Sequence, residues 1–370
     1  MLADRIRLGL AELRAKKLLR EPRVVEEFRG PYAVVEGRKV LNFASNDYLG
    51  LARDPRLVEA ARRVPGGWGP ASSRLLAGTT RAHLELEESA AEFLGVEATL
   101  LFPSGYMANL GMIGAITGES TTVLSDELNH ASLIDACRLS RARIVRIPHG
   151  DLEFLERELR KPGEKLVLTD SVFSMDGDVA PLRAISDLAD RHGADLVVDD
   201  AHGFGVFGEG RGVVAEAGAR VALRCVTFSK AAGGVGGLVA GSQEAIEFLR
   251  TRARTFMFTT APPAAVCAAA LEALRILRDP ERRDRLWRNV RRFSPRAASP
   301  IVPVVVGDNE EAVAESRRLW DRGFWVPAVR PPAVPPGTAR LRISVTALHE
   351  IEHLDALAEA VNLRTRVEKG

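Results

Sequence analysis

Short apolar runs alternate with longer amphipathic segments through the middle of the chain. The runs are rich in Val, Leu and Ile and end in small or polar residues, which is typical of strands buried on both faces of a sheet. We predict strands over residues 98–102, 122–125, 143–147, 165–170, 195–199, 222–228 and 238–241.

The segments between these runs repeat their apolar residues with the spacing of an α-helix. Strands that alternate with helices indicate an α/β domain, here with a large, mainly parallel seven-stranded sheet. Ligands of such sheets bind at the carboxyl ends of the strands, so motifs that directly follow the predicted strands are the candidates for chemistry. The predicted helices cover 81–94, 106–116, 131–140 and 182–192.

The pattern changes after Pro262. A long helical stretch runs to Arg292, and Thr346 is expected to cap a last amphipathic helix. Between these helices we predict strands over 301–306 and 339–345 and a helix over 310–322. The C-terminal part therefore predicts a smaller α+β domain. We place the large domain at 46–275 and the small domain at 276–370.

Composition and charge narrow the class of protein. Hydrophobic residues make up 46% of the chain and charged residues 27%, which suits a folded globular protein. With 51 basic and 49 acidic residues the net charge is +2, which gives no electrostatic reason to expect nucleic-acid or membrane partners. The three cysteines form no CxxC pair, and neither a signal peptide nor a membrane-spanning run stands out. We expect a cytoplasmic protein with reduced thiols.

The strongest local motif is VTFSKAAGGVGG at 226–237, in which Lys230 follows a predicted strand and precedes a glycine-rich loop. Glycines let the backbone approach a bound ligand closely. A partly desolvated lysine at a strand end can form a Schiff base. Taken alone, however, the motif is more typical of a surface lysine that starts a loop.

A second motif, LVVDDAHGFG at 196–205, ends a predicted strand in Asp199 and brings His202 close behind it. An aspartate in this position can keep a pyridine nitrogen protonated, which turns a pyridine ring into an electron sink. The ordinary alternatives are a helix cap or a salt-bridged loop carboxylate.

Two predicted helices also start directly after strands. FPSGYMAN at 102–109 turns into a helix at Gly105 and Tyr106, where free backbone N–H groups can bind a phosphate. His130 stands at the other helix start and could lie flat against a cofactor ring. A plain serine cap and a structural histidine explain the same residues.

The order of these motifs along the chain is more specific than any one of them. A phosphate turn, a histidine, Asp-x-x-His and then a lysine follow in the succession of fold-type I enzymes that use pyridoxal 5′-phosphate (PLP). In detail the chain resembles the α-oxoamine synthases over most of its length. The resemblance rests on LNFASNDYLGL (41–51), SRLLAGTTRAHLELE (73–87), SGYMAN (104–109), NHASLIDA (129–136), VFSMDGDVAPL (172–182), VDDAHGFGVFGEGRG (198–212) and TFSKAAGGVGG (227–237).

The resemblance implies a fold-type I PLP-dependent transferase that condenses an amino acid with an acyl thioester and releases CO2. It implies that the cofactor is held as a Schiff base on Lys230, which then acts as general base. It also implies a homodimer with active sites at the interface and N-terminal residues 1–45 that pack with the small domain. The further roles that it implies are ring-nitrogen partner for Asp199, ring stacking and substrate contact for His130, ring-oxygen contacts for His202 and Ser174, cofactor and phosphate binding for Gly105, Tyr106 and Thr227, and a phosphate contact for Thr260 of the second subunit.

The C-terminal segment resembles one branch of this family. IVPVVVGDN and GFWVPAVRPPAVPPGTARLRISVTALHE are similar to the branch that condenses L-alanine with pimeloyl-CoA or pimeloyl-acyl carrier protein in biotin biosynthesis. This resemblance implies that Arg330 anchors the alanine carboxylate with Asn46 nearby, and that Arg20 contacts the acyl group. Two features depart from the family pattern: Ala333 stands where a threonine is expected, and residues 69–74 lack the usual glycine-rich sequence. We expect these departures to affect acyl-chain selectivity rather than the PLP chemistry. The alternatives within the family are a glycine C-acetyltransferase and another α-oxoamine synthase.

Two other patterns point to different functions. His-Glu-Ile-Glu-His at 349–353 fits the zinc pattern HExxH, but it also reads as the start of an amphipathic helix, and we expect no metal. Residues 203–208 fit GxGxxG, which would indicate a nicotinamide-dependent oxidoreductase, but more glycines follow, as in a loop. A PLP fold that has lost catalysis is the third alternative, and the intact Lys230 and Asp199 argue against it.

Overall fold

The computed structural model describes residues 1–16, 18–19, 22–65 and 68–361. The chain forms two compact units. The larger unit comprises Asn46–Ser174 and Asp178–Arg285, and the smaller one Met1–Ser45, Met175–Gly177 and Leu286–Gly370. The second boundary lies at Arg285 rather than at residue 275, because α11 (Ala264–Leu277) packs against α2 (Pro55–Arg62) and α3 (Arg81–Leu94) of the larger unit.

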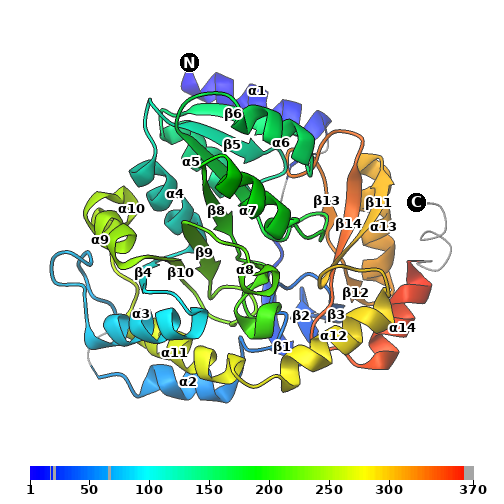
Figure 1. Cartoon of the computed structure of the whole chain (residues 1–370). Helices are drawn as coiled ribbons and strands as arrows, with labels where there is room; N and C mark the ends of the chain where they lie inside the picture. Colours follow the sequence, from blue (N-terminus) through cyan, green and yellow to red (C-terminus); the bar gives the residue numbers. More distant parts are fainter. Residues whose placement is uncertain (17, 20–21, 66–67, 362–370) are drawn as a thin grey trace. The chain divides into compact units, whose positions relative to one another are not determined.

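The larger unit is built on one seven-stranded sheet with the order β4-β10-β9-β8-β7-β5-β6 (Figure 1). Every strand runs parallel except β10, which is antiparallel to both of its neighbours. Apart from the edge strand β6, the strands are almost entirely buried, which confirms the predicted α/β class with a mainly parallel sheet. Their bounds are β4 Ala98–Phe102, β5 Thr122–Asp126, β6 Arg143–Ile147, β7 Lys165–Asp170, β8 Asp195–Asp199, β9 Leu223–Thr227 and β10 Gly237–Gly241.

Helices connect and cover these strands. One core cluster joins buried residues of the sheet to apolar side chains of α4, α5, α9 and α10, while α3 and α7 pack against β4 and β8. The bounds of the remaining helices of this unit are α4 Gly105–Ile116, α5 Ala131–Leu139, α6 Leu152–Leu159, α7 Leu182–Arg191, η1 Gly208–Gly210, α8 Val213–Ala217, α9 Gln243–Arg252 and α10 Arg254–Met257.

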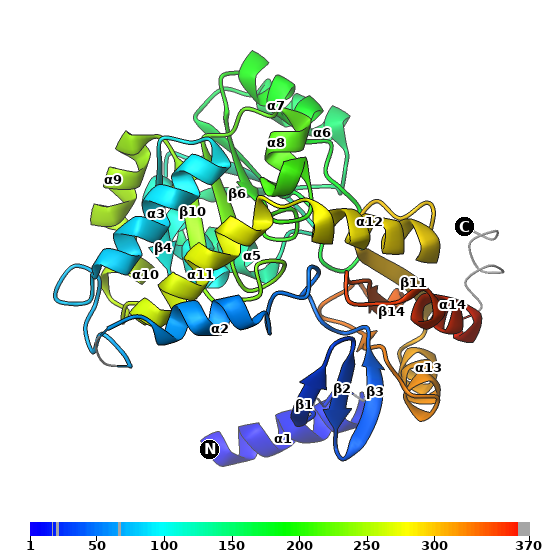
Figure 2. The same ribbon diagram turned by 90° about the horizontal axis from the view of Figure 1, so that it is seen from below.

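The smaller unit contains two sheets (Figure 2). In the first, the N-terminal strands β1 (Val25–Arg29), β2 (Tyr32–Val35) and β3 (Arg38–Asn42) are extended by β12 (Phe324–Trp325), which pairs with β3 in parallel. This pairing joins the two ends of the chain into one unit. The second sheet has the order β11-β14-β13, with β11 Ile301–Gly307, β13 Ala328–Val329 and β14 Ala339–Ser344. The helices of this unit are α1 Leu2–Ala15, α12 Glu281–Phe293, which starts in the larger unit, α13 Asn309–Asp321 and α14 Ile351–Ala360.

The long helix expected up to Arg292 is wrong in one respect, because it consists of two helices. α11 ends at Leu277 and α12 begins at Glu281. Pro280 lies between them, and a proline disfavours helical conformation in the residue before it and cannot donate a hydrogen bond. The Asp279 side chain accepts a hydrogen bond from Glu281 N at 3.0 Å and so starts α12.

The HExxH segment is also built differently from the prediction. The helix begins at Ile351 with Glu350 as its N-cap, not at Thr346. Thr346 and His349 instead form a tight turn in which Thr346 N donates to His349 Nδ1 at 3.0 Å. The His349 ring stacks on Phe43 with centroids 4.1 Å apart, and its Nε2 lies 3.2 Å from Asn42 O. Both ring nitrogens thus have partners inside the fold.

Two absences concern only the described ranges. In them no three His, Cys, Asp or Glu side chains are grouped so that they could hold a metal ion. None of the helices in the same ranges combines the length and the apolar character that a membrane crossing requires.

Candidate active site

The polar residues singled out in the larger unit gather at one edge of its sheet. The parallel strands end at this edge, so Gly105, His130, Asp199 and Lys230 all follow carboxyl ends of strands or close the strand itself. The antiparallel β10 begins at the same edge with Gly237. Side chains that are far apart in the sequence therefore share one site.

The start of α4 forms an anion-binding cradle. Ser104 is the N-cap, and its Oγ accepts a hydrogen bond from Met107 N at 3.2 Å. The first N–H groups of a helix have no partner within it and carry partial positive charge, so they favour a phosphate. A Cβ atom added at Gly237 would lie 2.5 Å from Gly105 N, which shows how closely the backbone of β10 approaches this helix start.

The turn after β9 fixes Lys230. The Thr227 hydroxyl donates to Gly236 O at 2.7 Å and accepts from Ser229 N at 3.2 Å. Gly233 N donates to Lys230 O at 2.9 Å. The strand end and the glycine loop are thereby tied together around a half-buried lysine.

Asp199 is buried at the end of β8 with both carboxylate oxygens held. Oδ1 accepts from Ala201 N at 3.0 Å, and Oδ2 accepts from the Asn109 amide at 2.6 Å. Two donors from different elements give this carboxylate a fixed orientation, as a partner for a protonated ring nitrogen requires.

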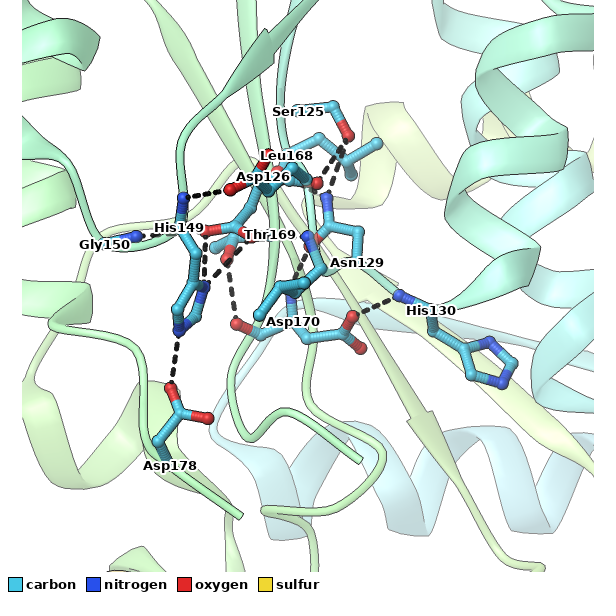
Figure 3. Close-up of polar contacts among 12 residues, drawn as sticks. Ser125, Asp126, Asn129, His130, His149, Gly150, Leu168, Thr169, Asp170 and Asp178 are labelled. Carbon is cyan, nitrogen blue, oxygen red and sulfur yellow. Dashed lines mark hydrogen bonds and ion pairs between the residues drawn. The ribbon is translucent and has the colours of Figure 1, made fainter. Parts of the chain in front are cut away.

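His130 is the N-cap of α5 (Figure 3). Its backbone N–H donates to Asp170 Oδ2 at 2.6 Å, and its Nδ1 accepts from Ser132 N at 3.3 Å. A neutral ring with this contact carries its proton on Nε2. Desolvation lowers the pKa of His130; the charge of Asp199 opposes the shift and that of Lys230 adds to it. His130 is exposed, so its ring is accessible to a planar ligand.

His202 is buried close behind Asp199 and is held by Tyr48. The Tyr48 hydroxyl lies 2.8 Å from His202 Nδ1 and 3.3 Å from Asn46 Oδ1. Tyr48 itself is fully buried, and it was missed as a site residue although it lies in the motif SNDYLGL. It links the predicted ring-oxygen contact to the predicted substrate contact.

Asp170 is a second buried carboxylate at this edge that the sequence reading missed. Burial raises its pKa well above the usual value, and the neighbouring charge of Asp199 adds to the shift. Its backbone N donates to Asn129 Oδ1 at 2.9 Å, and the Asn129 amide donates in turn to Leu168 O at 2.8 Å. The signal was available, because the predicted strand 165–170 ends in an aspartate just as β8 does.

His149 lies between two carboxylates next to this network (Figure 3). Its Nδ1 lies 3.1 Å from Asp126 Oδ2, and its Nε2 lies 2.9 Å from Asp178 Oδ2. Desolvation lowers the pKa of His149, but the charges of Asp126 and Asp178 outweigh it, and the net shift is upward. The bridge links the end of β5 to the segment that follows Ser174.

Three further candidates belong to other segments of the chain. Thr260 is exposed in the larger unit and bridges to Ser73. Arg330 belongs to the smaller unit, is half-buried and lines a cavity of about 670 Å³ together with Trp320 and Trp325. Arg20 lies outside the described residues.

The residues at the sheet edge fit PLP. A helix start faces the glycine turn, a fixed carboxylate and a neutral imidazole are available for the ring, and a lysine follows the next strand. Fold and site together define a fold-type I PLP-dependent transferase, which confirms the predicted cofactor and fold. The family model of class I and II aminotransferases matches residues 38–361, and the chain belongs to this family, within it to the α-oxoamine synthases.

The chain is similar in sequence to curated enzymes of one name. The chain is 47% identical to 8-amino-7-oxononanoate synthase of Aromatoleum aromaticum, with 98% of each chain covered. It is 48% identical to the enzyme of the same name from Methylococcus capsulatus, over 95% of this chain and 96% of that protein.

Solved structures agree on the fold. Serine palmitoyltransferase of Sphingomonas wittichii superposes with a TM-score of 0.91 at 35% identity, covering 98% of this chain and 96% of that chain. The 8-amino-7-oxononanoate synthase of Francisella tularensis gives a TM-score of 0.76 at 25% identity, over 90% and 99%.

Proposed function

We propose that this protein catalyses the PLP-dependent decarboxylative condensation of L-alanine with a pimeloyl thioester to 8-amino-7-oxononanoate, a step of biotin biosynthesis. The observation that carries the proposal is the gathering of Lys230, Asp199, His130 and His202 at one sheet edge, in a chain 44–48% identical to proteins of that name. The identity to serine palmitoyltransferases is lower, 33–35%.

Lys230 has two functions in this proposal. Its amine holds the cofactor at rest and, once the amino acid takes its place, removes the proton from the substrate Cα. PLP, when bound, supplies an electron sink for the negative charge that develops on that carbon. The nucleophilic carbon would then attack the thioester carbonyl, and the C–S bond would break with the thiol leaving after it takes up a proton. Loss of the former amino acid's carboxylate as CO2 would leave negative charge on the same carbon, and a proton returned to that carbon would complete the product.

Asp199 and His130 set the electronic character of the site. The buried Asp199 carboxylate stabilises a protonated pyridine nitrogen, which strengthens the electron sink. His130 would pack against the ring, and its Nε2–H is not engaged in the Ser132 contact that Nδ1 makes, so it would be available to the substrate carbonyl. His202 and Ser174 would contact the ring oxygen, and Gly105, Tyr106 and Thr227 would hold the phosphate.

The substrate contacts come from more than one segment. Arg330 anchors the alanine carboxylate through its planar guanidinium, Asn46 assists, and Arg20 contacts the acyl group. Ala333 lacks the hydroxyl that the family resemblance leads one to expect there, so this substitution concerns acyl-chain selectivity rather than the PLP chemistry.

A second subunit completes the site in this proposal. Thr260 is exposed within one chain and stands next to the 69–74 loop through its bridge to Ser73, which supports a role across an interface of a cytoplasmic homodimer. Equilibrium sedimentation at catalytic concentrations tests this. A monomer that retains full activity contradicts it.

A substrate panel tests the function. Alanine, glycine and serine are each paired with pimeloyl, acetyl, succinyl and palmitoyl thioesters of CoA, and the pimeloyl group also with acyl carrier protein. Alanine with a pimeloyl thioester is expected to give the highest kcat/KM. Faster turnover of glycine with acetyl-CoA identifies a glycine C-acetyltransferase instead, and serine with palmitoyl-CoA identifies a serine palmitoyltransferase.

A further inference from the structure

Asn109 connects two parts of the site that the sequence treats separately. Its side-chain amide lies 2.6 Å from Asp199 Oδ2 and 2.8 Å from Ser132 Oγ. Ser132 Oγ in turn lies 2.8 Å from His130 Nδ1. Asn109 and Ser132 are each only 1% exposed, so this chain of hydrogen bonds is shielded from water.

The donor directions follow from the chemistry of the partners. A carboxylate only accepts, so the Asn109 amide nitrogen must face Asp199. The Asn109 amide nitrogen also donates to Ser132 Oγ, which leaves the serine hydroxyl proton to be donated to His130 Nδ1. His130 Nδ1 also accepts a hydrogen bond from Ser132 N, at 3.3 Å. The chain therefore favours a neutral His130 with its proton on Nε2.

This arrangement leaves the other polar atom of the Asn109 side chain, Oδ1, buried and without a hydrogen bond among the described residues. An unsatisfied buried carbonyl is unfavourable, and an apolar side chain of similar size would fill the space without it. The amide is therefore explained by what its nitrogen donates to, not by packing.

We propose that Asn109 is a positioning residue that couples the carboxylate expected at the ring nitrogen to the imidazole expected on the ring face. Asn109 belongs to α4, whose start forms the phosphate cradle, and it fixes Asp199 of β8 directly and His130 of α5 through Ser132. The three elements that would hold the cofactor are thus connected through one buried amide. The inference rests on the PLP chemistry of the proposed function but not on the choice of substrates.

Two variants interrupt this series of hydrogen bonds at different points. Asn109→Ala removes the donor to Asp199 and the link to Ser132, whereas Ser132→Ala removes only the link to His130. We expect Asn109→Ala to weaken PLP binding about 10-fold or more, because a charge-assisted hydrogen bond is lost. It should also shift the pH titration of the visible band of the lysine-bound cofactor. Ser132→Ala should keep PLP affinity within about 3-fold of wild type, because the bond between Asn109 and Asp199 remains.

The effect of the two variants on His130 can be measured without the cofactor. In the apoprotein, NMR of the histidine ring nitrogens should show mainly the Nε2–H tautomer for His130 in the wild type. Its share should be smaller in both variants, in which only the longer 3.3 Å contact from Ser132 N still favours it. The groups that face His130 and act on its titration are Asp199 and Lys230, and neither is altered in these variants. Wild-type PLP affinity, visible titration and His130 tautomer in folded Asn109→Ala overturn the proposal, and an unchanged tautomer in Ser132→Ala overturns the coupling.

Two further variants separate positioning from folding. Asn109→Asp keeps the shape but places a second carboxylate against Asp199, so PLP binding should be weaker than wild type at neutral pH and recover as the pH falls. If Asn109→Ala does not fold, this variant and Ser132→Ala decide the question. Asn289→Ala is the matched control, because Asn289 is also buried and donates to Thr346 O and His349 O in the smaller unit. It should lower stability and leave PLP affinity and the spectrum unchanged.

Discussion

The setting of Lys230 results from a few local contacts. The strand before it is fully buried, and the Thr227 hydroxyl ties that strand to the glycine loop behind the lysine. The lysine is half-buried, which suits an amine that must lose its proton during the reaction. The Thr227 hydroxyl and the glycine loop therefore fix the backbone that carries this side chain.

Lys230 is predicted to be the attachment point of PLP. Borohydride treatment should fix the cofactor on the peptide that contains Lys230, and Lys230→Ala should lose the visible band and reduce activity by at least about 10³-fold. Peptide mapping and absorbance measure this. The exposed Lys161, which pairs with Glu158, is the control, and Lys161→Ala should behave as wild type. A label on another peptide would falsify the assignment.

Arg330 is predicted to bind the alanine carboxylate. Charge-assisted bidentate contacts are worth roughly 1.5–3 kcal/mol, so Arg330→Ala should reduce kcat/KM for alanine about 10- to 100-fold with PLP still bound. Arg330→Lys should recover little, because an ammonium cannot reproduce the planar fork. If steady-state kinetics with alanine are unchanged, Arg340 or Arg342 in the strand that follows is the next candidate.

At the scale of elements, the site depends on how strand ends and helix starts approach each other. β10 runs against its neighbours, so its first residue meets the start of α4 where the phosphate is expected. Further along the same edge of the sheet, Asn129 connects the ends of β5 and β7. His149 connects the end of β5 to the segment after β7 (Figure 3). These contacts fix the separation of the elements that carry the site residues.

Gly237→Ala should disturb the phosphate cradle. The new Cβ would lie 2.5 Å from Gly105 N, so the backbone must shift. We expect a loss of on the order of 1–3 kcal/mol in the free energy of unfolding and PLP affinity lowered about 10-fold. Gly114→Ala on the same α4 is the control, because nothing lies within 4 Å of its added Cβ, and it should be neutral or slightly stabilising. Equal behaviour of the two variants in denaturation and PLP titration would refute the cradle.

The His149 bridge should stabilise the protein in a pH-dependent way. Its folded pKa is raised, so the contribution is complete below the unfolded pKa of about 6.5 and is lost as the pH rises through the folded pKa. The gap in Tm between wild type and His149→Asn should therefore narrow from about pH 6 to about pH 9. His192→Asn, which loses a longer 3.6 Å contact to Glu156, is the control. A gap that widens with pH would reverse the sign and exclude the charged bridge.

At the scale of the whole molecule, the predicted site residues are distributed over two units. The larger unit holds the expected cofactor residues, and the smaller one holds Arg330 and joins the two ends of the chain through β3 and β12. Residues Met175–Gly177 belong to the smaller unit although their neighbours in sequence belong to the larger one. The pair of Arg340 and Asp176 lies within the smaller unit and holds this short excursion.

Removal of metal should not affect the protein. Burial lowers the pKa of His349 to about 3, and its ring stacks on Phe43 with both nitrogens engaged, so it has a structural part in the smaller unit. His353 instead contacts the Tyr32 hydroxyl at 3.0 Å. Dialysis against a chelator should leave Tm and activity as before, and elemental analysis should find no stoichiometric zinc. One tightly bound zinc per chain whose removal abolishes activity would overturn this.

The amino-acid sequence by itself determined the large sheet and the order of its chemical groups. Strands such as Ala98–Phe102 and Lys165–Asp170 could be predicted because burial on both faces leaves an unbroken apolar run between turn residues. The small N-terminal strands were missed, although Glu36 and Gly37, both at positive φ, form the kind of two-residue turn that signals a hairpin. The break at Pro280 was missed because helical periodicity continues on both sides of it.

Only the tertiary structure decided which side chains hold the site residues in place. Asn109 and Tyr48 lie in recognised motifs and Asp170 ends a predicted strand, but nothing local indicates their partners. Their contacts to Asp199, His202 and His130 join segments far apart in the sequence and depend on how the chain folds. Strand order is not encoded in the local pattern of apolar residues, which is the same for every buried strand. The chemical groups can therefore be predicted from the sequence, whereas their supports and protonation states follow from long-range packing.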